Sequence, residues 1–261
     1  MRKLLLLVIV LQSFFAFGQK ISNNLVGKYK NKSFWSFVYT SLEFDGKGTA
    51  IVDGKEYYDY FEKDNTVYVL AGGGGLIFEK VNGNELKGIS KKVRKSTFIA
   101  HDDEFKYGPK TPGSEKRLEL LDKFYNWNYV ETDALFERKG EGNFMASMKT
   151  VKQGNQKLCD AGLDTACIQV FIYGLGEKAI GVVSVLSDDS VKKVEHPKAD
   201  PELEKLGYKI IDMGNNEGYG LLYSYYTIID QEKKGIELNE KGLKKGCRLC
   251  ASNKEIYEKE L

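Results

Sequence analysis

The sequence predicts an α+β protein of two parts, a small antiparallel β domain followed by an α-helical repeat region. In the first hundred residues, short runs rich in Val, Ile, Tyr, Phe and Thr alternate with turn signals, which is typical of an antiparallel meander. Further along, a glycine, a small residue and a tyrosine recur at fixed offsets, which indicates repeated helix pairs. A chain of 261 residues is long enough for two domains of ordinary size.

Residues 1–18 have the pattern of a secretory signal peptide. Arg2 and Lys3 form a charged start, Leu4 to Phe17 is an apolar run, and Ala16 and Gly18 are the small residues expected before a cleavage site. The run is shorter than the ~20 apolar residues that a membrane-spanning helix needs. We therefore expect an exported bacterial protein, periplasmic or extracellular, without stable membrane insertion after cleavage. A retained membrane anchor is the alternative.

Cleavage of this peptide leaves a chain without net charge. The sequence has 39 Lys plus Arg and 37 Asp plus Glu, and cleavage removes Arg2 and Lys3 but no acidic residue. A neutral chain has no overall attraction to polyanions, so we expect no nucleic-acid partner. Export also implies an oxidising compartment, in which the four cysteines are expected to form disulfides rather than to bind metal or act as nucleophiles.

Residues 19–100 are expected to form the β domain. DG, NG and glycine-rich turns separate its runs, and such a meander closes into a small barrel or folds over as a sandwich. The GGGG turn at 72–75 lacks the Lys-Ser/Thr ending and the following helix of a phosphate-binding loop, so we expect a hairpin loop there. The predicted strands are Ser36–Phe44, Gly48–Val52, Glu56–Glu62, Thr66–Leu70, Leu76–Val81, Glu85–Ile89 and Ser96–Ala100.

The opening LVGKY at Leu25–Tyr29, followed by a meander, resembles bacterial lipocalin-like domains. Gly27 and Tyr29 correspond to the glycine and tryptophan of the lipocalin first-strand signature, with tyrosine in place of tryptophan. The resemblance implies an internal apolar cavity, and with it a small apolar ligand as an alternative partner.

Residues 101–114 are expected to link the two domains, because this polar segment holds two prolines and two glycines. It begins with His101 to Glu104, an imidazole followed by three acids. Adjacent residues cannot all face one ion in regular structure, so we expect a solvated linker there rather than a metal site. Ser114 has the residue type of an N-cap, and the helical region is predicted to cover 115–261.

Three copies of one spacing define the helical region. From Gly162, Ala166 lies four residues on and Tyr173 eleven residues on. These offsets are close to whole numbers of helical turns, so the small residue and the tyrosine share one helix face. Each glycine suits the end of the preceding helix, where a left-handed residue is needed. The other two copies are Gly214, Gly218 and Tyr225, and Gly246, Cys250 and Tyr257.

This pattern resembles Sel1-like repeats, which are related to tetratricopeptide repeats. The resemblance covers residues 143–261 and implies a helical solenoid with a protein- or peptide-binding surface. Cys159 and Cys167 flank Gly162 as in the cysteine-rich secreted branch of the family, where such a pair joins adjacent helices by a disulfide. We interpret residues 174–200 as an insertion, either a helix extension or a strand. A generic helical bundle is the alternative.

Few residues point to catalysis. The only histidines in the sequence are His101 in the linker and His196 in a charged segment, and neither has an apolar, pocket-like context. Cys247 and Cys250 form a CRLC motif, for which a redox site, a local disulfide and a cap of the last helix pair are the alternatives. We predict no catalytic residue, no cofactor and no metal.

The sequence therefore predicts an exported, non-enzymatic binding or scaffold protein. It would contact a protein or peptide through exposed faces of the helices that follow Gly162 and Gly214. The alternatives are a carrier of a small apolar ligand in the β domain, and an envelope thiol-redox protein that uses Cys247 and Cys250.

Overall fold

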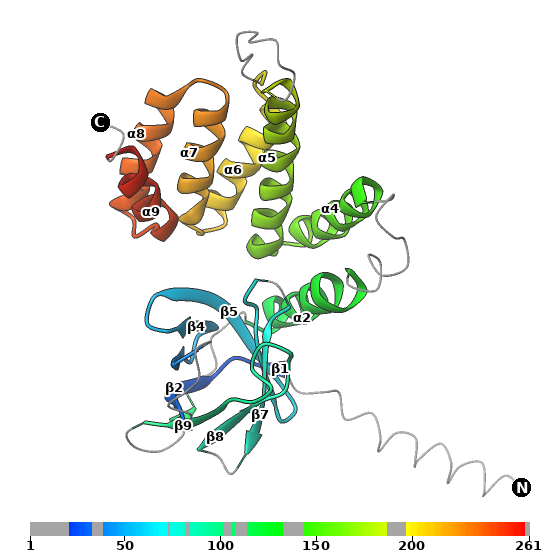
Figure 1. Cartoon of the computed structure of the whole chain (residues 1–261), viewed down its shortest axis with the longest axis vertical. Coiled ribbons are helices and arrows are strands. Elements are labelled where there is room, and N and C mark those ends of the chain that lie inside the picture. The colour runs from blue at the N-terminus through cyan, green and yellow to red at the C-terminus, as the bar shows by residue number, and fades with distance from the viewer. Residues whose placement is uncertain are drawn as a thin grey trace, which may run out of the picture. The chain divides into compact units, whose positions relative to one another are not determined.

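The computed structural model of the chain describes residues 21–32, 39–72, 74–81, 84–101, 106–107, 114–132, 144–186 and 197–258. The predicted signal peptide lies outside these residues. The chain divides into two compact units, Met1–Tyr125 and Asn126–Leu261. Strands dominate the first unit and helices the second (Figure 1). The predicted α+β organisation in two parts is confirmed.

The first unit is an antiparallel barrel closed by the eight strands β2 to β9. Each strand pairs with the next along the chain, and β9 pairs with β2 to close the ring. Of the two architectures left open by the sequence, this pairing gives the barrel. The short strands β1 (Ile21–Ser22) and β10 (Lys106–Tyr107) pair antiparallel with β5 and β2, respectively. The barrel strands are β2 (Leu25–Asn31), β3 (Ser41–Asp45), β4 (Thr49–Val52), β5 (Glu56–Lys63), β6 (Thr66–Val69), β7 (Leu76–Val81), β8 (Glu85–Gly88) and β9 (Thr97–Ala100).

Large apolar side chains occupy the barrel interior. Alternate residues point inward, as on β3, where Leu42 and Phe44 are buried between more exposed neighbours. The Phe44 ring packs edge-to-face on Tyr29 and Tyr60, with centroid distances of 5.8 and 4.9 Å. The interior is therefore a packed core. Its buried side chains are Leu25, Tyr29, Leu42, Phe44, Ala50, Val52, Tyr60, Val67, Val69, Ala71, Leu76, Phe78, Leu86, Val93 and Phe98.

A buried carboxylate ties the start of the chain to the barrel. Glu62 on β5 is 1% exposed and accepts hydrogen bonds from the backbone N–H of Leu25 at 3.0 Å and the Ser22 hydroxyl at 3.3 Å. Its other oxygen lies 2.9 Å from Nζ of Lys80 on β7. The carboxylate thus joins β5 to three other strands, and its charge is compensated by one ammonium, one backbone N–H and one hydroxyl.

Helix α2 (Ser114–Tyr125) packs on the barrel, which moves the boundary between the units. Asp122 pairs with Lys63 at 3.0 Å, and Arg117 pairs with Asp59 at 2.9 Å. The Tyr125 ring packs on Tyr68 at 4.9 Å between centroids. The boundary therefore follows Tyr125, whereas the sequence placed the linker at 101–114. Within that segment, β10 is part of the sheet, and residues 102–105 and 108–113 lie outside the described ranges.

Three helix pairs make up most of the second unit, and Figure 1 shows their arrangement. A short π-helix, η1 (Asn126–Glu131), precedes them. The backbone φ angles of the three turn glycines, Gly162, Gly214 and Gly246, are +104°, +87° and +80°. All three are in the left-handed region that a helix end requires. The pairs are α4 (Phe144–Asp160) with α5 (Asp164–Leu186), α6 (Pro201–Asp212) with α7 (Glu217–Ile228), and α8 (Glu232–Leu243) with α9 (Arg248–Tyr257).

Small residues let these helices approach closely. A Cβ atom on Gly218 would lie 2.9 Å from the Gly207 carbonyl oxygen, and a Cβ atom on Gly242 would lie 2.5 Å from Sγ of Cys250. Ala166 and Cys250, the small residues of the first and third copies of the repeat, are fully buried. Of the repeat tyrosines, Tyr225 and Tyr257 are buried and Tyr173 is half-buried. Small residue and tyrosine therefore act in packing.

The predicted insertion at 174–200 begins inside α5. The helix continues to Leu186, so this part is a helix extension and not a strand. Residues 187–196, including His196, lie outside the described ranges. Among the helices that the structure describes, none is both long and apolar enough to cross a bilayer.

Candidate functional site

The helical unit contains a groove of about 890 Å³ where α4, α5 and α6 meet. Its floor is apolar. Val170 on α5 and Leu203 on α6 are 3% and 7% exposed, and Gly174 allows Leu203 to approach, because a Cβ atom there would lie 2.9 Å from it. Tyr208 lines the groove and is 38% exposed. The remaining lining residues are Lys152, Gln156, Asp160, Glu177, Lys178, Asp200, Glu202, Lys205, Leu206, Lys209, Asp212 and Met213.

Three ion pairs join the walls of this groove. Lys152 on α4 lies 2.6 Å from Glu177 on α5. Lys178 on α5 lies 3.2 Å from Asp200, which precedes α6. The third pair joins Lys209 on α6 to Asp160 on α4 at 3.2 Å. Exposed pairs contribute little stability, about 0–1 kcal/mol each. Their main effect is to place charges of both signs around an apolar floor.

Asp200 caps the helix that forms one wall. Its carboxylate accepts hydrogen bonds from the backbone N–H groups of Glu202 at 3.1 Å and Leu203 at 3.2 Å, as an N-cap does. Burial by itself would raise the pKa of Asp200, but these hydrogen bonds and the Lys178 ammonium outweigh it, so the pKa is lowered from its ordinary 3.8.

This lowered pKa predicts a specific pH dependence. A carboxyl group with a lower pKa in the folded state stabilises the fold above its unfolded pKa, and that contribution is lost as the pH falls through the folded value. Asp200→Asn keeps the cap acceptor but does not titrate. We expect this variant to melt below wild type at neutral pH, and the difference in Tm to vanish as the pH falls below 3.8. A Tm difference that is constant with pH would contradict the assignment.

Glu204, one turn before Tyr208 on α6, belongs to a tyrosine–glutamate cluster. Glu204 accepts hydrogen bonds from the Tyr226 hydroxyl and, at 3.0 Å, from Nζ of Lys234 on α8. The Lys234 ammonium also lies 4.2 Å from the centre of the Tyr226 ring. The hydrogen bond from Tyr226 is the main cause that lowers the pKa of Glu204. The cluster fixes α6, α7 and α8 together beside the groove.

The first disulfide lies beside the groove. Cys159 on α4 is bonded to Cys167 on α5, and both are fully buried. Nζ of Lys209 lies 3.4 Å from the carbonyl oxygen of Cys159, at the end of α4. The bond therefore joins the two helices at the turn that precedes the α5 wall. This is the pairing that the Sel1-like resemblance implies.

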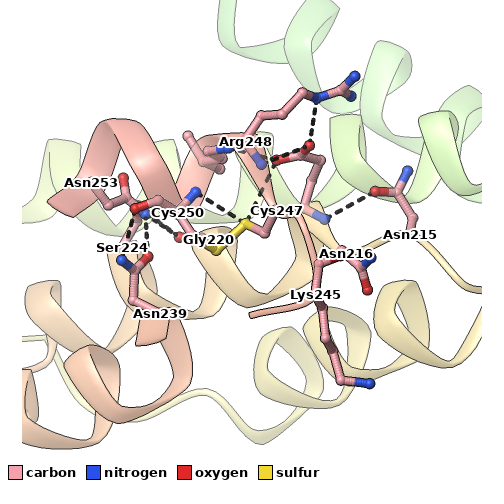
Figure 2. Close-up of a disulfide and its surroundings, with 12 residues drawn as sticks. Asn215, Asn216, Gly220, Ser224, Asn239, Lys245, Cys247, Arg248, Cys250 and Asn253 are labelled. Carbon is pink, nitrogen blue, oxygen red and sulfur yellow. Dashed lines mark hydrogen bonds and ion pairs between the residues drawn. A yellow bond between two sulfur atoms is a disulfide. The ribbon is translucent and has the colours of Figure 1, made fainter. Parts of the chain in front are cut away.

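The second disulfide joins Cys247 to Cys250 at the start of α9 (Figure 2). Sγ of Cys247 accepts a hydrogen bond from the Cys250 N–H at 3.0 Å, so this cysteine caps the helix. Asn239 donates to the Cys250 carbonyl at 2.8 Å, and Asn253 donates to Asn239 at 3.1 Å. Because the cysteines are 3% and 0% exposed, the geometry is that of a buried staple rather than of an open redox site.

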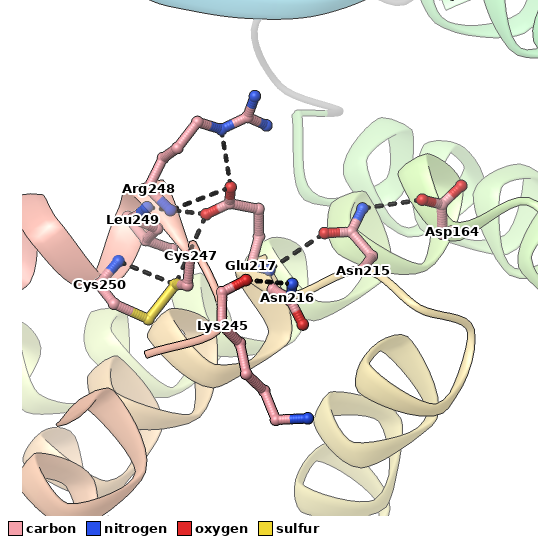
Figure 3. Close-up of polar contacts among 9 residues, drawn as sticks. All are labelled: Asp164, Asn215, Asn216, Glu217, Lys245, Cys247, Arg248, Leu249 and Cys250. Carbon is pink, nitrogen blue, oxygen red and sulfur yellow. Dashed lines mark hydrogen bonds and ion pairs between the residues drawn. A yellow bond between two sulfur atoms is a disulfide. The ribbon is translucent and has the colours of Figure 1, made fainter. Parts of the chain in front are cut away.

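A chain of polar contacts links the three glycine turns (Figure 3). Asn215 donates to Asp164 at 2.8 Å. One oxygen of Glu217 accepts from the Leu249 N–H at 2.7 Å, and the other accepts from Nε of Arg248 at 2.9 Å. Glu217 thus caps α9 from α7. Neither Asn215 nor Glu217 was predicted from the sequence, although both closely follow a repeat glycine, where a capping side chain is common.

The groove coincides only in part with the contact surface that the sequence predicts. The helix after Gly162, α5, does line it through Val170, Gly174, Glu177 and Lys178. The helix after Gly214, α7, does not, because its residues from Gly218 to Tyr226, except Ser224, are buried. The other walls of the groove are formed by α4 and α6. Helix α7 is buried because it contacts neighbouring helices on several sides, among them α6, α8 and α9.

Other candidate sites receive less support. Over the described parts of the chain, no group of three or more His, Cys, Asp or Glu side chains is placed to hold a metal ion. His101 is an exposed residue after β9. The packed barrel core weighs against a carrier, and the buried Cys247–Cys250 bond weighs against thiol-redox chemistry.

Comparisons with known proteins give no match: no family model, curated protein or solved structure is significantly similar to this chain.

Proposed function

We propose that this protein is an exported, non-enzymatic binding protein whose groove between α4, α5 and α6 holds a peptide segment of another protein. The observation that carries the proposal is the groove itself, an apolar floor of Val170 and Leu203 within a rim of paired charges. Its volume of about 890 Å³ is in the range of specific ligand sites. The resemblance to Sel1-like repeats and the two disulfides support this function and the exported location.

The rim chemistry favours a peptide over a small apolar molecule. Lys152, Lys178 and Lys209 each have a carboxylate partner, so a ligand meets dipolar pairs of both signs. A peptide matches such a surface, because its backbone and side chains offer donors and acceptors at short intervals. Its apolar side chains can cover the floor. Tyr208 is suited to be an anchor, since a half-exposed tyrosine gives a large contact area at low cost in side-chain entropy.

Peptides selected from a random display library on the full mature chain test the proposal. Tyr208→Ala is expected to weaken their binding at least tenfold in a titration calorimetry measurement, as loss of an anchoring tyrosine does. The matched control is Tyr57→Ala on the barrel, because Tyr57 is 41% exposed and Tyr208 38%. The control is expected to bind within about twofold of wild type. Equal losses in the two variants, or a loss only in the control, would overturn the proposal.

A further inference from the structure

A basic loop connects β8 to β9 on the barrel. From Leu86 to Ala100 the chain has five cationic residues and no acidic residue. The charged side chains are exposed except for Lys92, which is half-buried. Here the basic loop comprises Lys91, Lys92, Arg94 and Lys95, together with Lys87 at the end of β8.

The loop is held in one conformation by the barrel. Val93, in its middle, is 1% exposed and belongs to the barrel core. Its N–H donates to the Ser90 carbonyl at 3.0 Å, and its carbonyl accepts from the Ser96 N–H at 2.8 Å. The Ser90 hydroxyl donates to the Gly75 carbonyl at 3.2 Å. Because Val93 is buried, its charged neighbours point to solvent. Binding through these charges would therefore not require the conformational entropy cost of ordering a free loop.

Within the described residues, no ion pair compensates the charge of the basic loop. The Lys92 ammonium donates to a backbone carbonyl, that of Gly72. In the register of β7 and β8, the acidic Glu79 lies opposite Lys87. A further cation, the exposed Lys32, adjoins the loop, because its N–H donates to the Thr97 carbonyl at 2.7 Å. The local charge is therefore strongly positive although the chain as a whole is balanced.

Two exposed isoleucines accompany these cations. Ile89, at the base of the loop, is 43% exposed, and Ile99, on the adjoining strand, is 37% exposed. Ile99 lies between Lys30 and Glu85 in the sheet register. Cations beside exposed aliphatic side chains are the combination found on surfaces that rest on a bilayer, where charges meet headgroup phosphates and apolar groups enter the interface.

We propose that the basic loop is a peripheral docking surface for an anionic lipid membrane, through the phosphates of its headgroups. A nucleic acid backbone would use the cations but gains nothing from Ile89 and Ile99. An acidic protein segment is the other polyanion that the charges would attract, and the experiment below separates the two. The surface lies on the β unit and the groove on the helical unit, so the two proposals stand or fail separately.

Sedimentation of the full mature chain with lipid vesicles tests this inference. Vesicles that contain phosphatidylglycerol are expected to bind the protein, and pure phosphatidylcholine vesicles are not. Each cation near an anionic surface changes affinity about fivefold, the equivalent of about 1 kcal/mol. Lys91→Gln/Lys95→Gln is therefore expected to weaken binding roughly 25-fold, and added salt should weaken wild-type binding as well.

The matched control removes two exposed lysines from the helical unit, Lys233→Gln/Lys244→Gln, with the same change in net charge. It is expected to bind the vesicles as wild type does. Circular dichroism and thermal unfolding check that both variants fold. Failure of wild type to bind phosphatidylglycerol vesicles overturns the inference, as does an equal loss in the control. Binding to polyglutamate without binding to vesicles reassigns the surface to an acidic protein partner and also overturns it.

Discussion

Replacing Glu62 by alanine is expected to lower the free energy of unfolding of the β unit by about 3–5 kcal/mol, the effect of removing one partner of a buried ion pair. The side chain of Lys80 is only 13% exposed, so its amine would lie in a poorly hydrated place without its carboxylate partner. The Leu25 N–H would lose its acceptor as well. Urea unfolding, with hydrogen exchange to locate the loss in β1, β2, β5 and β7, measures the effect.

Glu79→Ala is the control for this change. Glu79 lies on β7 beside Lys80, but it is exposed, and we expect a change within about 0.5 kcal/mol. Glu62→Gln should give an intermediate result, because an amide oxygen can still accept from Leu25 but carries no charge to pair with Lys80. If Glu62→Ala unfolds at the same urea concentration as Glu79→Ala, the carboxylate does not stabilise the barrel and this account of its role is wrong.

The variant Cys159→Ala/Cys167→Ala is expected to destabilise the helical unit by about 2.5 kcal/mol, from the entropy of closing a short loop. The two cysteines are separated by 8 residues in sequence. Both are fully buried, so no hydration compensates for the loss of contacts. Since the bond joins α4 to α5, the groove should widen and peptide affinity should fall together with stability. Denaturant unfolding and peptide titration of one preparation measure both.

The second disulfide provides a comparison. Cys247 and Cys250 have a sequence separation of only 3, so Cys247→Ala/Cys250→Ala should cost about 1.6 kcal/mol and leave the groove intact. Peptide affinity is the discriminating quantity. If both double variants lose affinity equally, the groove depends on overall stability and not on the α4–α5 connection.

Much of the barrel could be predicted from sequence because its signals are local. DG and NG turns separate runs with a period of two, and the strands β4 to β9 fall where those runs were placed. Closure depends on the pairing of β2 with β9, two strands that are far apart in sequence. The local pattern alone could therefore not distinguish a barrel from a sandwich. The turn glycines could also be predicted from local sequence, since a helix that ends in a left-handed residue favours glycine at that position.

The features that sequence reasoning missed depend on tertiary contacts. Helix α2 has the composition of a repeat helix, yet its partners Lys63, Asp59 and Tyr68 lie on the barrel. The exposed face expected on α7 is buried because α6, α8 and α9 all contact it. The basic loop was not predicted because only the net charge of the whole chain was considered. That sum does not show that Lys91, Lys92, Arg94 and Lys95 lie together.

Hydrogen exchange of the full mature chain, with and without a selected peptide, tests the central claim most directly. Bound peptide is expected to slow exchange of amides in the C-terminal half of α4, the middle of α5 and along α6, with no change in β2 to β9. Protection that falls in the barrel strands, or at the start of α9, would place the peptide elsewhere and contradict the claim that the groove of α4, α5 and α6 is the binding site.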